Sequence, residues 1–70
     1  MIVIGYQATN AEDVIEDTIV SEHEIYNEAQ IAFNSMIESN LDNENIVQFL
    51  WGLRLNPDEY QITAFVDKPV

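Results

Sequence analysis

The residues best suited to chemistry are crowded into one segment, Thr9–Glu28, which holds seven carboxylates and the only histidine but no lysine or arginine. Two carboxylates can hydrolyse a glycosidic bond when an apolar cleft raises the pKa of one of them. A chain of 70 residues leaves little room for such a cleft. A nucleophilic triad needs a base beside its nucleophile, and His23 stands among glutamates. We therefore predict no enzymatic activity, no catalytic residue and no cofactor.

A second run of oxygen-bearing side chains, "NLDNENI", could suggest a cation site around Asp42 and Glu44. The glycine and the distal bidentate glutamate of a calcium-binding loop are missing from it. The chain also has no cysteine, so it offers no thiolate ligand and no disulfide. We interpret the run as a polar connection and predict no metal site.

The balance of charge separates the remaining function classes. Thirteen acidic residues face only Arg54 and Lys68, which gives a net charge of −11. Phosphate binding requires a basic surface, so direct binding to nucleic acid is excluded. Self-repulsion of this size opposes compaction and exceeds what solubility requires, which suggests that the charge has a use. The sign indicates a basic protein as the partner.

The acidic segment must be positioned by the elements around it. The opening "MIVIGYQAT" alternates in polarity and is rich in β-formers, which predicts a strand. After a turn, "DVIEDTIVS" favours the second arm of a hairpin, although its apolar residues also fit a helical period. Residues 12–20 thus remain either strand or helix at this point.

The next element is predicted to be a helix. "SEHE" matches a capping box in which Ser21 and Glu24 each bind a free backbone amide, so we expect the helix to begin there. An apolar stripe continues to about Ser39 and comprises Ile25, Ala29, Ala32, Phe33, Met36 and Ile37.

The last third of the chain predicts a second hairpin. Apolar residues alternate from Val47 to Leu55, which favours a strand, with a short buried helix over 44–53 as the alternative. Pro57 and Asp58 fit the centre of a turn. The final strand is predicted to place four residues on one face: Tyr60, Ile62, Ala64 and Val66.

These elements predict one α+β domain over 1–70, a small antiparallel sheet with one long helix packed on a face, in the order β-β-α-β-β. The alternative is a mostly helical fold with a two-stranded sheet. A composition that is 47% hydrophobic argues for a folded chain. The apolar run in "MIVIG" is too short for a signal peptide or a membrane span, so we expect a soluble cytoplasmic protein.

The predicted registers leave apolar side chains on the sheet face away from the helix: Val3, Ile15, Ile46, Leu50 and Phe65. A contiguous exposed patch of this kind usually marks an interface. A two-fold dimer is the commonest way to cover one. We therefore expect a homodimer whose contact is apolar and lies away from the acidic segment.

The carboxylate spacing suits mimicry of a phosphate chain. Carboxylates at i and i+2 on a strand lie about 6.6 Å apart and those at i and i+4 on a helix about 6 Å, near the spacing of successive phosphates along a DNA strand. Glu24 and Glu28 have the helical spacing, as do Glu12 with Glu16 and Asp13 with Asp17 if that segment is helical.

In size, acidity and its segment "AEDVIEDTIVSEHEIYNE", the chain resembles the small bacteriophage host-takeover proteins that mimic DNA, among them the Bacillus phage inhibitors of the histone-like nucleoid protein HU. The resemblance implies a homodimer that occupies the DNA-binding surface of HU in the bacterial cytoplasm or nucleoid. By position, the mimic carboxylates are Glu12, Asp13, Glu16, Asp17, Glu22, Glu24 and Glu28. Loop residues Asp42, Glu44, Asp58 and Glu59 are weaker candidates. The alternative function is an acidic antitoxin or anti-defence protein that neutralises another basic protein, such as a nuclease or toxin.

Overall fold

The computed structural model describes residues 1–69, and these form four strands and one helix in the predicted order β-β-α-β-β. The elements are β1 (Ile2–Thr9), β2 (Ile15–His23), α1 (Tyr26–Ser39), β3 (Ile46–Asn56) and β4 (Glu59–Asp67). The strands make one antiparallel sheet in the order β2-β1-β3-β4. The strand prediction is confirmed for both ambiguous segments, and the mostly helical alternative is wrong.

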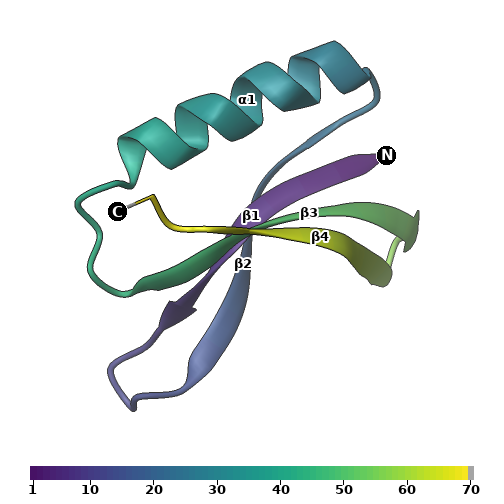
Figure 1. The fold of residues 1–70 in the computed structure, drawn as a ribbon. Coiled ribbons are helices and arrows are strands. Elements are labelled where there is room, and N and C mark those ends of the chain that lie inside the picture. Colours follow the sequence, from purple (N-terminus) through teal and green to yellow (C-terminus); the bar gives the residue numbers. More distant parts are fainter. Residues whose placement is uncertain (70) are drawn as a thin grey trace.

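One face of the sheet carries the main core. Figure 1 shows α1 crossing above the sheet, with the two hairpins splayed beneath it. Phe33 and Met36 of α1 pack against Ile4, Ile46 and Phe49 of the central strands. Full burial of such side chains stabilises a fold by about 1.5–3 kcal/mol each, so this cluster is the main apolar contribution to folding.

The two hairpins share one irregularity that bends the sheet. Gly5 of β1 lies beside a bulge in β2, and Gly52 of β3 lies beside a bulge in β4. A Cβ at either glycine would collide with the carbonyl oxygen of the neighbouring strand, so the backbones approach closely only because both residues are glycine. β1 and β3 pair so that Val3 lies opposite Gly52 and Leu50 opposite Gly5. The hairpins are therefore related by an approximate two-fold axis between β1 and β3.

Because of bulges, several residues lie on the other face of the sheet from the one predicted. One extra residue at Val47 places Ile46 in the core beneath α1, rather than on the opposite face. The bulge at Thr63 separates the predicted row in β4: Tyr60 and Ile62 pair with one face of β3, whereas Ala64 and Val66 pair with the helix face. A bulge shifts alternation by one residue, so the predicted faces are wrong beyond each bulge.

The start of the helix is also corrected. Ser21 lies within β2, and its hydroxyl lies 2.9 Å from Nε2 of His23. The helix begins at Tyr26 with Ile25 at the N-cap position, and no side chain caps it. The capping-box prediction is wrong because β2 continues to His23 in its pairing with β1. The predicted end at Ser39 is confirmed.

The side of the sheet away from α1 is less exposed than predicted. Val3 and Leu50 are completely buried there, while Ile15 and Phe65 are about half exposed. Ile46 lies in the main core, and Val3 and Leu50 are buried. Of the five residues assigned to a dimer contact, only Ile15 and Phe65 therefore remain accessible. The expected apolar patch is thus smaller than the sequence indicated.

Candidate functional site

The turn between β1 and β2 presents the first two candidate carboxylates, Glu12 and Asp13, and both are exposed. The side-chain oxygen of Asn10 accepts hydrogen bonds from the backbone amides of Glu12 (2.8 Å) and Val14 (3.1 Å), which fixes the turn. Asp13 has φ of 67°, a left-handed conformation that aspartate tolerates better than most residues. The turn therefore holds both carboxylates at the tip of the hairpin.

Along β2, neighbouring carboxylates point to opposite faces. Glu16 pairs with Ala8, which packs against the main core, while Asp17 pairs with Gln7 on the other face. The helical i, i+4 spacing considered for this segment therefore does not exist. β2 is an outer strand of the sheet, so Glu16 is exposed along an open edge.

Asp17 is engaged within the protein. It accepts a hydrogen bond of 2.8 Å from the Gln7 amide and one of 3.1 Å from the Tyr60 hydroxyl. Tyr60 belongs to β4, the opposite outer strand, so the sheet must curl to bring these residues together. The pKa of Tyr60 is raised by partial desolvation and then by the hydrogen bond and negative charge of Asp17. Asp17 thus ties the two hairpins together.

Glu22 is also engaged. Its Oε1 lies 2.6 Å from Nε of Arg54, which reaches it from β3 across β1, and this is the only ion pair within residues 1–69. The guanidinium also lies 5.6 Å from the centre of the Tyr60 ring. Both charged side chains keep a quarter to a third of their surface in water, so the pair contributes less than about 1 kcal/mol. These contacts orient the carboxylate of Glu22 toward its own sheet.

Glu24 and Glu28 lie at the other end of β2. Glu24 precedes the helix, so the predicted i, i+4 helical pair with Glu28 is wrong. Glu28 lies in the first turn of α1, where the helix dipole favours a negative charge. The nine residues of β2 separate these two carboxylates from the hairpin tip by about 26 Å.

The structure therefore divides the seven candidates. Asp17 and Glu22 bind partners within the chain. The other five are exposed and have no side-chain bond within residues 1–69, and they are hereafter the five exposed carboxylates: Glu12, Asp13, Glu16, Glu24 and Glu28. Glu12 and Asp13 lie at the hairpin tip, Glu16 lies near the start of β2, and Glu24 and Glu28 lie beyond the far end of the strand. These two groups at the ends of β2 are hereafter the β2 border, which is not a concave site.

The weaker candidates are exposed as well and lie outside this border. Asp42 and Glu44 belong to the connection between α1 and β3, and Asp58 and Glu59 lie at the turn between β3 and β4. No three acidic or histidine side chains within 1–69 are grouped closely enough to hold a metal ion.

The partners of Asp17 and Glu22 are the functional contacts that sequence reasoning missed. For Glu22 the sequence held a signal: with only two basic residues in so acidic a chain, Arg54 would be expected to form an ion pair with one of the carboxylates. No comparable signal linked Tyr60 to Asp17, since that contact depends on strand order and on the curl of the sheet.

Comparison with known proteins gives no relative: no family model, curated protein or solved structure matches the chain. Within residues 1–69, α1 falls short of the length and apolar character that a membrane-spanning helix needs.

Proposed function

We propose that the protein is a DNA mimic that occupies the DNA-binding surface of a basic DNA-binding protein, with a nucleoid protein of the HU type as its target. The observation that carries this proposal is the β2 border of five exposed carboxylates, three at the hairpin-tip end of the strand and two beyond its far end, which no cation within residues 1–69 neutralises. The proposed role requires no chemistry, only occupancy, and its place is the cytoplasm or nucleoid of a bacterial host.

Two features support an extended contact. The border spans the length of β2, about 26 Å, and DNA offers a basic protein a similarly extended distribution of charge. The hairpin tip and the helix start fix its two ends by backbone structure. Carboxylates whose backbone is held in a folded hairpin and helix lose less conformational entropy on binding than those of a flexible acidic tail would.

The test is displacement of a labelled DNA duplex from a purified HU-type protein. The complex should weaken by an order of magnitude or more as salt rises from about 50 to 200 mM, because screened charge pairs dominate it. Affinity that does not change with salt would contradict mimicry. Capture of a single nuclease or toxin from bacterial lysate, without displacement of DNA from HU, would favour the antitoxin alternative.

A further inference from the structure

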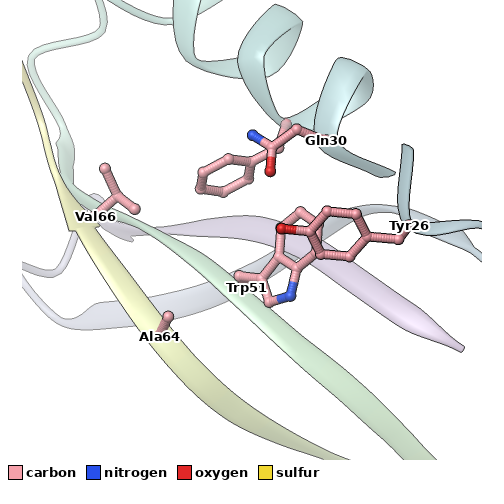
Figure 2. A pocket seen from close by; sticks show the side chains of 6 residues that line it. Tyr26, Gln30, Trp51, Ala64 and Val66 are labelled. Atoms are coloured by element: carbon pink, nitrogen blue, oxygen red, sulfur yellow. The ribbon is translucent and has the colours of Figure 1, made fainter. Parts of the chain in front are cut away.

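A groove of about 320 Å³ lies beside α1, on the side of the sheet that carries the main core. The backbone of α1 lies closest to β1 and β2 and its side chains reach Ile46 and Phe49 of β3, so the same face of β4 is left partly open. Figure 2 shows Ala64 and Val66 of β4 on one side of the groove, Gln30 above it, and Tyr26 beside Trp51. The proposed function makes no use of this groove.

Half of the six residues that line the groove are aromatic. Trp51 meets Phe33 and Tyr26 edge to face, with ring centres 5.5 and 5.6 Å away. Gln30 supplies an amide, and no lining residue is charged. Aromatic rings attract a cation over their faces, and the aliphatic stem of arginine or lysine packs on the same surface. The lining therefore suits a long cationic side chain.

The cations of this chain lie elsewhere. Arg54 is bound to Glu22, and its strand partner Tyr60 bonds to Asp17 on the opposite face of the sheet. The Lys68 ammonium donates to the carbonyl of Asn43. A groove without a cation of its own, in a chain of net charge −11, is a favourable site for a foreign cation.

The outer strand β4 offers a way to deliver such a side chain. Its residues from Tyr60 to Val66 carry no charge, while Glu59 and Asp67 stand at its two ends. An extended segment can pair with the part of this open edge that follows the bulge at Thr63, and alternate side chains then lie on one face. Those on the helix side would lie beside Ala64 and Val66, at the groove. The β2 edge is less suited to pairing because it carries carboxylates.

We propose that the groove receives an arginine or lysine side chain from an extended segment of a basic partner, whose backbone pairs with β4. The inference rests on the proposed function in that the partner is basic. A second copy of this chain fits the site less well, because it would bring eleven further net negative charges and no free arginine or lysine. The groove adds an apolar anchor to a contact that is otherwise electrostatic.

Trp51 is the only tryptophan of the chain and lines the groove, so its fluorescence reports on occupancy. The probe is a synthetic peptide that alternates arginine with valine, and its control replaces arginine by citrulline, which has the same shape without the charge. We expect the arginine peptide to change the Trp51 emission and to bind about fivefold more tightly than the citrulline peptide.

Two variants distinguish binding in the groove from general electrostatic attraction to the protein. Gln30→Lys places a cation in the groove and should weaken the arginine peptide about fivefold. Ser35→Lys makes the same change of net charge at an exposed site roughly 140° around the helix, and should weaken binding by less than twofold. Circular dichroism checks both folds. Should Gln30→Lys fail to fold, Tyr26→Leu at a largely exposed position should weaken the peptide two- to fivefold in its place.

Equal binding of the two peptides, or equal weakening by the two lysine variants, would overturn the inference. Displacement of DNA from the HU-type protein distinguishes this failure from that of the proposed function. If the variants differ as expected but the wild type displaces no DNA, the inference about the groove is supported and the proposed function is refuted. If the wild type displaces DNA while the two variants weaken peptide binding equally, the proposed function is supported and the inference about the groove is refuted.

Discussion

Replacement of Gly5 by alanine tests the bend that brings the hairpins together. The new Cβ would lie 1.9 Å from the carbonyl oxygen of Thr18, where real contacts essentially never fall below 3.0 Å. The backbone of β2 must therefore move by about 1.1 Å or more at the centre of its pairing with β1. Overpacking costs about 1–3 kcal/mol, and we expect about 3 kcal/mol because backbone rather than a flexible side chain must move. A domain of this size has only about 4–10 kcal/mol in total.

Gly52→Ala gives an internal comparison, because its Cβ would lie 2.4 Å from the carbonyl oxygen of Gln61 and requires a smaller shift. We expect a cost of about 1–2 kcal/mol. Urea unfolding followed by Trp51 fluorescence measures both, and Gly5→Ala should lower the midpoint by about 3 M at a slope near 1 kcal/mol/M. Ser35→Ala is the control and should change stability by less than about 0.5 kcal/mol. A smaller loss for Gly5→Ala than for Gly52→Ala would refute this account of the bend.

Three further predictions concern the turn, the curl of the sheet and assembly. Asp13→Gly should leave stability unchanged or raise it by up to about 1 kcal/mol in thermal unfolding, because glycine accepts the left-handed backbone without strain; a loss would contradict this. The raised pKa of Tyr60 stabilises the fold below its ordinary pKa of 10.0, and this contribution is lost as pH rises through the raised value. The stability advantage of wild type over Tyr60→Phe should therefore shrink above about pH 10, and a constant difference would argue against the bond to Asp17. A proposed homodimer through the exposed apolar residues Ile15 and Phe65 should strengthen with salt, and a mass near 8.0 kDa by sedimentation equilibrium at low and high salt would refute it.

The element order could be predicted from the sequence because alternation and helical periodicity are local signals. Of the six residues in the predicted helix stripe, Ala29, Phe33 and Met36 are buried as expected, whereas Ile25 precedes the helix and is exposed. The errors arise where tertiary pairing overrides a local pattern. Ser21 matches a cap, yet strand pairing with Ile4 keeps it in β2. Nothing in the sequence around Val47 predicts a bulge. Val47 is nevertheless an extra residue in β3, and it places Ile46 on the opposite face of the sheet from the one predicted.

The candidate site was predictable in composition but not in detail. The sequence alone located the acidic segment, because a run of carboxylates without cations needs no knowledge of the fold. It could not show that Asp17 and Glu22 differ from the other carboxylates. Their partners, Tyr60 and Arg54, lie on other strands and come close only because the sheet curls. Such long-range contacts leave no periodic trace in a single sequence.

The most direct test of DNA mimicry compares two variants that each carry five neutral replacements. The first replaces the five exposed carboxylates by glutamine or asparagine. The second makes the same kind of change at five exposed acidic residues away from the β2 border: Glu38, Asp42, Glu44, Asp58 and Glu59. Both variants change the net charge from −11 to −6, so bulk attraction to a basic protein falls equally.

Displacement of labelled DNA from an HU-type protein at fixed salt is then measured for both variants. Five contacts at roughly 0.5 kcal/mol each predict about a seventyfold weaker first variant, while the second should weaken less than about threefold. Circular dichroism should show both variants folded, since neither set includes Asp17 or Glu22. Equal weakening of the two variants, or full activity of the first, would contradict the claim that the β2 border is the DNA-mimicking surface.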